Sequence, residues 1–249
     1  MLTVYGVPFS QPVRAVLWVL LYKRLPFKLV LINPGTTGKN GSRHPSFLAK
    51  NPGGTIPTIE EEDGFCLGEA HAILTYLAKK HGWTDLYPND LKVQAKIDQY
   101  LHFHHRNIRD CSISMVAPRI RKDIVMPEPI LKMNTYNAHR SIQYLNDLFL
   151  GVNDGNKFII GNNLTLADFC CYVEVGQLQA QFTNTYKGWD KVPRVQNWLE
   201  LMGKVAYHDE VHSVLTVLGD ISEEPPTKDT IRNANKTALK QVSGSIASL

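Results

Sequence analysis

The sequence predicts a protein with an α/β first part and an all-helical second part. In residues 1 to about 80, short apolar segments that favour strands alternate with segments that favour helices. Beyond residue 90 the strand signal disappears, and apolar residues recur every three or four positions. At 249 residues the chain can bury one large core or two smaller ones. We therefore expect a small mixed sheet covered by helices, joined to a helical domain.

The composition is that of an ordinary globular protein, with 43% hydrophobic and 20% charged residues. The net charge of +4 is spread along the chain, so a nucleic-acid partner is not expected. No apolar stretch has the length of a membrane span and no signal sequence is recognisable, so we expect no membrane association and a cytoplasmic location. Cys66, Cys111, Cys170 and Cys171 lack metal-ligand spacing, which indicates free thiols in a reducing compartment.

In the first part, strand and helix signals can be assigned in order. We expect strands at 2–5 and 27–32, a helix at 12–23, a hairpin formed by "TIPTIEE" and "FCLG" with its turn at Asp63-Gly64, and a helix at 69–80 before Gly82. In the second part we expect helices at 91–115, 129–150 and 165–178, and a fourth that begins at Pro193. Thr165 and Asp168 have the spacing of a capping box.

The expected domains are 1–82, a linker at 83–90, a helical domain at 91–222 and a polar segment at 223–249. In the last of these, Ile231, Ala234, Ala238, Val242 and Ile246 have helical spacing, but the composition is polar enough for disorder. Both a weakly amphipathic helix and a disordered tail fit this segment.

Ser10 stands at the start of the first expected helix, two residues before Pro12. A serine there is typical of a helix cap. The same hydroxyl can instead hold an anion, because a helix N-terminus favours negative charge. Further along, Ile56-Pro57 ends a loop before a strand, and Glu69 opens the next helix. Exposed backbone groups, a carboxylate and helix N-termini together fit a small zwitterionic peptide that carries a thiol.

The motifs "SQPVRAV", "NPGGTIPT" and "EAHAILTYL", followed by an all-helical part, resemble the cytosolic glutathione S-transferases. The resemblance runs from about residue 2 to 215 and includes "FHHRNIR" and "NLTLADF". It is greatest to the serine-dependent theta class, with the insect delta class next. It implies a thioredoxin-like N-terminal domain with Pro57 as its cis-proline, an all-α C-terminal domain, and a homodimer.

The resemblance also implies an activity. Glutathione would be the co-substrate, and its thiolate would attack small hydrophobic electrophiles or reduce organic hydroperoxides. As catalytic residues, Ser10 would donate a hydrogen bond to the glutathione sulfur and Arg109 would reach toward the sulfur or the electrophile. The backbone of Ile56 would pair with the cysteinyl part of glutathione, and Glu69 would meet the γ-glutamyl amine. The other glutathione-binding candidates are Gln11, Ser42, His44, Thr55, Pro57 and Ala70.

Three positions depart from the family pattern. Ala70 stands where most relatives have a serine, and the missing hydroxyl removes a bond worth about 1.5–3 kcal/mol, or roughly ten- to a hundredfold in glutathione affinity. Ser42 stands where theta and delta enzymes have a histidine, and His44 is a candidate substitute. Thr55 lies near a position where theta enzymes often have a lysine. The glycyl end of glutathione is therefore poorly specified.

Other interpretations remain open at this stage. Tyr5 could be the hydroxyl donor, since other classes use a tyrosine near this position. His102, His104 and His105 lie on one helix with spacings that do not converge, so no metal is expected. A different class of function is a non-catalytic binding or interaction protein with the same fold, which the changes at Ala70 and Ser42 favour. An isomerase like the related zeta enzymes is disfavoured, because their serine-rich motif with a neighbouring cysteine is missing.

Overall fold

The computed structural model describes residues 1–121, 125–152 and 155–249. Contacts within the chain define two compact units. Unit 1 consists of Met1–Gly82, Ala206–Val214 and Asn233–Leu249, and unit 2 consists of Trp83–Val205 and Leu215–Arg232. The domain bounds expected from the sequence, at residues 82, 90 and 222, stay a prediction. Within the described ranges, no helix has the length and apolarity that crossing a membrane requires.

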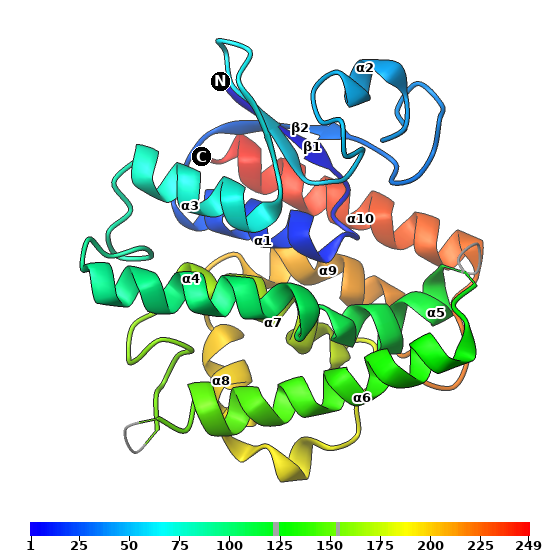
Figure 1. Ribbon diagram of the computed structural model, residues 1–249. Coiled ribbons are helices and arrows are strands. Elements are labelled where there is room, and N and C mark those ends of the chain that lie inside the picture. Colours follow the sequence, from blue (N-terminus) through cyan, green and yellow to red (C-terminus); the bar gives the residue numbers. More distant parts are fainter. Residues whose placement is uncertain (122–124, 153–154) are drawn as a thin grey trace. The chain divides into compact units, whose positions relative to one another are not determined.

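Unit 1 contains a four-stranded mixed sheet with helices packed against it (Figure 1). Its N-terminal elements are β1 (Leu2–Gly6), α1 (Gln11–Tyr22), β2 (Phe27–Leu31), α2 (Pro45–Leu48), β3 (Thr58–Glu60), β4 (Cys66–Gly68) and α3 (Ala70–Lys80). The strand order is β2-β1-β3-β4, with β1 and β2 parallel and the other two pairs antiparallel. The predicted strand–helix–strand, hairpin and helix are all present, and Gly64 takes the positive φ of 87° that the hairpin turn needs.

Helix α1 forms the centre of unit 1, and every residue from 13 to 21 is buried. It packs against α3, and Figure 1 shows the two helices side by side. Close approach of β1 is possible because Gly6 has no side chain, since a Cβ there would lie 2.6 Å from Val13. On α1, the indole of Trp18 donates to the carbonyl oxygen of Ala206 at 2.8 Å. A segment from late in the sequence is thereby joined to the first helix.

The polar C-terminal segment is helical. Helix α10 runs from Lys228 to Ala247, and the part from Asn233 onward belongs to unit 1. Its buried residues are Ala234, Ala238 and Val242, which follow one another at four-residue intervals. Three of the five apolar positions expected on one face are thus buried, and the short side chains of two of them allow close packing.

Unit 2 is helical. Its elements are α4 (Leu91–Arg106), a π-helical turn at Cys111–Val116, α5 (Ala117–Ile120), α6 (Glu128–Tyr144), a π-helical turn at Leu145–Phe149, α7 (Leu166–Val175), short 3₁₀ turns at Gly176–Leu178 and Trp189–Lys191, and α8 (Pro193–Met202). Helix α9 (His208–Leu218) begins in unit 1 and ends in unit 2. All ten residues of α7 are buried, so α7 forms the core of unit 2.

The capping box of α7 is confirmed in its carboxylate arm. Oδ2 of Asp168 accepts from the backbone N–H of Thr165 at 2.9 Å and from its hydroxyl at 3.0 Å. Oδ1 accepts from the N–H of Ile159 at 2.9 Å and from the indole of Trp198 at 3.0 Å. Burial raises the pKa of Asp168 to about 6, and these donated hydrogen bonds oppose the rise. Asp168 therefore connects the start of α7 to α8.

The single long helix expected at 91–115 is wrong. Helix α4 ends at Arg106, and Asn107 leaves the helical conformation with φ −132° and ψ −81°. The side-chain amide of Asn107 donates to the carbonyl of Phe103 at 2.8 Å, the acceptor that its backbone N–H would use in a continuing helix. The backbone N–H bonds His104 instead, at 3.3 Å. Apolar spacing continues through this break, which is why the periodicity did not reveal it.

Candidate active site

The loops that carry the predicted ligand-binding residues of unit 1 leave the sheet at one end. In the sheet register, Tyr5 pairs with Thr58, and Thr58 pairs with Gly68. The end of β1, the beginning of β3 and the end of β4 are therefore neighbours. Gly6 also pairs with Leu31 at the end of β2. The segments after β1 and β4, before β3 and after β2 thus share this end of the sheet.

Ser10 occupies the N-cap position of α1, but its side chain makes no capping hydrogen bond. Only its backbone takes part in the helix start: its carbonyl accepts the first helical hydrogen bond, from the N–H of Arg14 at 2.9 Å. The residue is only partly buried. The hydroxyl is thus a donor at the positive end of a helix dipole that the helix itself does not use. Gln11 is also partly buried, and Pro12 follows it in the first turn.

Tyr5, the alternative hydroxyl, is committed elsewhere. It donates to Glu60, which also forms an ion pair with Lys50 at 2.5 Å. Burial and the bond to Glu60 raise the pKa of Tyr5. A phenol that donates to a carboxylate and holds its proton more firmly is a poor partner for a second anion. Of these two hydroxyls, the geometry favours Ser10 as the one that can donate to an anion.

The loop before β3 presents backbone groups. Ile56 precedes Pro57 through a cis peptide bond, as the resemblance implied. Among the described residues, neither the N–H nor the C=O of Ile56 has a hydrogen-bond partner. Asn51 holds the loop in place, since its amide donates to the carbonyl of Thr55 at 3.0 Å and to the hydroxyl of Thr58 at 3.0 Å. The backbone of Ile56 is therefore fixed yet open to a peptide, while Thr55 is exposed.

Glu69 stands at the N-terminus of α3 in a strained backbone conformation, with φ 65° and ψ 112°. A non-glycine residue in the left-handed region costs on the order of 1–3 kcal/mol and is frequent at functional sites. The side chain is exposed and makes no capping bond. Within the described part of the chain its carboxylate has no ion-pair partner, so it can meet an amine. Ala70 follows it, only 6% exposed.

Ser42 and His44 belong to the loop after β2 and have structural partners. Ser42 is completely buried, and its hydroxyl accepts from the N–H of Gly35 at 2.9 Å. It therefore fixes the loop internally and offers no surface to a ligand. His44 caps the short helix α2, with its Nδ1 accepting from the N–H of Ser46 at 3.3 Å. Because His44 is only partly buried, it stays a candidate for the glycyl end of glutathione.

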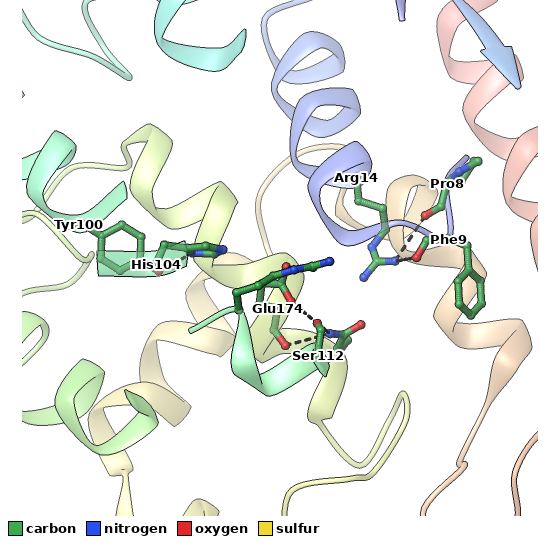
Figure 2. A network of polar contacts seen from close by, with 9 residues as sticks. Pro8, Phe9, Arg14, Tyr100, His104, Ser112 and Glu174 are labelled. Carbon is green, nitrogen blue, oxygen red and sulfur yellow. Dashed lines mark hydrogen bonds and ion pairs between the residues drawn. The ribbon is translucent and has the colours of Figure 1, made fainter. Parts of the chain in front are cut away.

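Arg14 is the residue of this region that the sequence interpretation missed. It is completely buried, and its guanidinium donates to the carbonyl oxygens of Phe9 at 2.9 Å and Pro8 at 3.4 Å, as Figure 2 shows. An arginine on a helix whose other residues from 13 to 21 are apolar is a signal that the sequence does contain. Such a charge needs dedicated partners when it is buried.

In unit 2, Arg109 is part of a polar network on the helical core. Its Nη1 pairs with Oε1 of Glu174, and Oε2 of Glu174 accepts from the hydroxyl of Ser112. Gln177 donates to the same hydroxyl and, at 3.2 Å, to the carbonyl of Glu174. Figure 2 shows Glu174 and Ser112 directed at one another. The Arg109 side chain is 32% exposed, so part of it reaches solvent. Glu174 was not identified from the sequence.

A mixed sheet of this order, with a cis-proline before β3 and helices packed against it, is typical of a thioredoxin-like domain, which here precedes a helical part. The predicted fold class is confirmed. Residues 4–85 match the family model described as "Glutathione S-transferase, N-terminal domain".

Curated relatives are similar to this chain over most of its length. Glutathione S-transferase theta-1 of Bos taurus is 27% identical over 224 residues, which cover 88% of this chain and 90% of that protein. Human glutathione S-transferase theta-2B is 29% identical over 212 residues, 83% of each chain. A solved human theta-class transferase, in complex with the glutathione conjugate of 1-menaphthyl sulfate, is 27% identical with a TM-score of 0.74 and coverage of 97% and 98%. The chain is thus similar to theta-class glutathione S-transferases over most of its length, and its first part matches their N-terminal domain.

Proposed function

We propose that the protein is a serine-dependent, theta-like glutathione transferase in which Ser10 stabilises the thiolate of glutathione. The observation that carries the proposal is the Ser10 hydroxyl, placed at the N-terminus of α1 without a capping bond. Two further features support it: among the described residues, the N–H and C=O of Ile56 have no hydrogen-bond partner, and Glu69 has an exposed carboxylate and a strained backbone. Relatives solved with glutathione or with a glutathione conjugate support glutathione as the co-substrate.

The chemistry asked of these residues is modest. A free thiol has a pKa of about 8.5, so little of it is ionised at neutral pH. The Ser10 hydroxyl and the dipole of α1 together supply roughly 1.5–3 kcal/mol of preference for the thiolate, which lowers its pKa by about one to two units. The thiol proton passes to solvent. The sulfur then forms a bond to an electrophilic carbon, whose leaving group departs with the bonding electron pair.

For the electrophile, we propose small hydrophobic compounds with halide or sulfate leaving groups. Sulfate displacement is supported by the relative that binds the conjugate of 1-menaphthyl sulfate. Reduction of organic hydroperoxides is a second proposed activity of the same thiolate: the sulfur takes one peroxide oxygen to give a sulfenic acid and an alcohol, and a second glutathione converts the sulfenic acid to the disulfide with release of water. Arg109 is proposed to assist the sulfur or the leaving group, since a guanidinium donates well to anions. We also propose a homodimer, which light scattering would report as twice the mass of one chain.

The test is a pH titration of thiolate absorbance for glutathione mixed with the protein. The unmodified protein and the Tyr5→Phe variant are expected to show a thiol that titrates below free glutathione, and Ser10→Ala is expected to lose this shift. Ser10→Thr keeps a hydroxyl and is expected to retain part of it. Loss of the shift in Tyr5→Phe with retention in Ser10→Ala would assign the donor to Tyr5 instead.

A second candidate, a non-catalytic binding protein, is favoured by one observation. Ala70 lacks the hydroxyl at the helix that receives the γ-glutamyl group in the family. If no bound thiolate appears at millimolar glutathione, the transferase proposal fails and this second candidate replaces it.

A further inference from the structure

Arg14 contacts three consecutive carbonyl groups of the segment that carries Ser10. Its guanidinium donates to Pro8 and Phe9, at 3.4 and 2.9 Å, and its backbone N–H donates to Ser10 at 2.9 Å. Figure 2 shows the guanidinium directed at the first two carbonyls. Arg14 thus holds the backbone of residues 8–10, the segment that leads into α1.

The peptide group that joins Phe9 to Ser10 is held at both ends. Its carbonyl accepts from Arg14, and its N–H donates to the carbonyl of Val7 at 3.0 Å. Because the Ser10 hydroxyl has no capping bond, its position depends on this peptide group. A movement of the Phe9 carbonyl would therefore move the hydroxyl.

Arg14 also places a permanent positive charge inside unit 1. A guanidinium stays protonated in proteins, and a buried charge is screened far less than an exposed one. The neighbouring residue His212 is completely buried, and burial, followed by the charges of Arg14 and His208, lowers its pKa well below the ordinary value. His212 is therefore neutral at physiological pH, and Arg14 is the lasting charge of this pair. Its sign adds to that of the helix dipole at Ser10.

We propose that Arg14 is a positioning residue of the thiolate site, which fixes the peptide group that carries Ser10 and contributes buried positive charge at the N-terminal turn of α1. This inference rests on the proposed role of Ser10. Arg14 acts through Ser10 and through its charge, without contact with the electrophile. Its removal should therefore alter the thiol pKa while leaving the KM for the electrophile unchanged.

The experiment compares Arg14→Met, which removes the charge and the donors, with Arg14→Lys. Lysine keeps the charge but cannot reproduce the planar guanidinium that donates to both carbonyls. Trp18→Phe is the matched control, because Trp18 lies one turn further along α1, and phenylalanine removes its indole donor to Ala206 while it keeps an aromatic ring near His208 and His212. The readouts are the pKa of bound glutathione thiol, kcat and KM as a function of pH, and thermal unfolding. We expect the thiol pKa to rise by about one unit in Arg14→Met, a tenfold loss of thiolate below the pKa, and by less in Arg14→Lys. Trp18→Phe should lower stability and leave the thiol pKa unchanged.

The outcomes separate this inference from the proposed function. If the unmodified protein does not lower the thiol pKa, the proposed function fails, and this inference fails with it. If the unmodified protein lowers it and folded Arg14 variants lower it equally, only the inference on Arg14 is overturned. If neither Arg14 variant folds while Trp18→Phe does, the residue serves the fold alone, which also overturns the inference. Partial rescue by lysine supports it.

Discussion

The guanidinium of Arg109 is paired with the carboxylate of Glu174, and Glu174 is only 1% exposed. Because the second carboxylate oxygen accepts from Ser112, Glu174 is satisfied at both ends by groups of the helical core. Arg109 is thus held by a buried carboxylate, while part of its side chain is in solvent. A cation held in this way is already oriented before an anion arrives.

Replacement of Glu174 by glutamine should destabilise the protein. The change leaves Arg109 without its counter-charge and turns an amide N–H₂ toward donors, so we expect a loss of roughly 2–3 kcal/mol, below that of a fully buried pair because Arg109 is partly exposed. Urea unfolding at neutral pH measures it. In the double variant with Arg109→Met, the loss in free energy of unfolding should be smaller than the sum of the losses in the two single variants. A loss under about 0.5 kcal/mol in Glu174→Gln would show that the pair contributes little.

Restoration of a hydroxyl at position 70 should tighten glutathione binding. Ala70→Ser places a hydroxyl at the first residue of α3, next to Glu69, where it can donate to the γ-glutamyl carboxylate. We expect the Kd for glutathione to fall by about tenfold or more. Isothermal titration calorimetry provides the measurement. Ala72→Ser, at an exposed position two residues along the same helix, is the control and should leave the Kd unchanged. Equal affinities in Ala70→Ser and the unmodified protein would contradict the expectation.

His212 should make the protein less stable in acid. Its pKa is lowered in the folded state by burial, and then by Arg14 and His208, so the unfolded chain binds a proton that the folded chain does not. The free energy of unfolding then falls as pH drops below about 6.5, by up to about 1.4 kcal/mol per pH unit from this group. Urea unfolding between pH 7.5 and 5 of the unmodified protein and of His212→Leu isolates the contribution. His102→Gln, at an exposed site, should retain the full pH dependence. The expectation is refuted if His212→Leu retains it too.

The buried stripe of α10 should be sensitive to charge. Ala238→Lys introduces a long cation at a position with 0% exposure, and we expect a loss of about 3 kcal/mol or more through overpacking and desolvation. Gln241→Lys, three residues further and exposed, should change stability by less than about 0.5 kcal/mol. Thermal unfolding of both variants is the measurement. Similar melting temperatures for the two would mean that α10 does not pack on unit 1 in solution.

The features that local sequence determines were predictable. The turn at Asp63-Gly64 and the capping box at Asp168 depend on residues within a few positions of each other, and both are present. The end of α4 was missed, because the bond from Asn107 to Phe103 leaves the apolar periodicity intact.

Contacts that depend on the folded chain were also missed. Ser42 looked like a ligand-binding residue from its place in the family pattern, yet its burial depends on how the loop after β2 folds back onto Gly35. Glu174 meets Arg109 across 65 residues of sequence, a distance over which spacing carries no information. The proposed ligand-binding residues themselves stay predictions until glutathione binding is measured.

Unit 1 draws on both ends of the chain, and this has a consequence for its synthesis. The sheet and α1 leave the ribosome before unit 2, but the residues at 206–214 and 233–249 that belong with them are translated after most of unit 2. At ordinary elongation rates the gap is roughly ten seconds or more. During that time the nascent sheet lacks part of its cover, and the indole of Trp18 has no Ala206 to meet. Unit 1 therefore completes its packing only after the intervening residues of unit 2 have been translated.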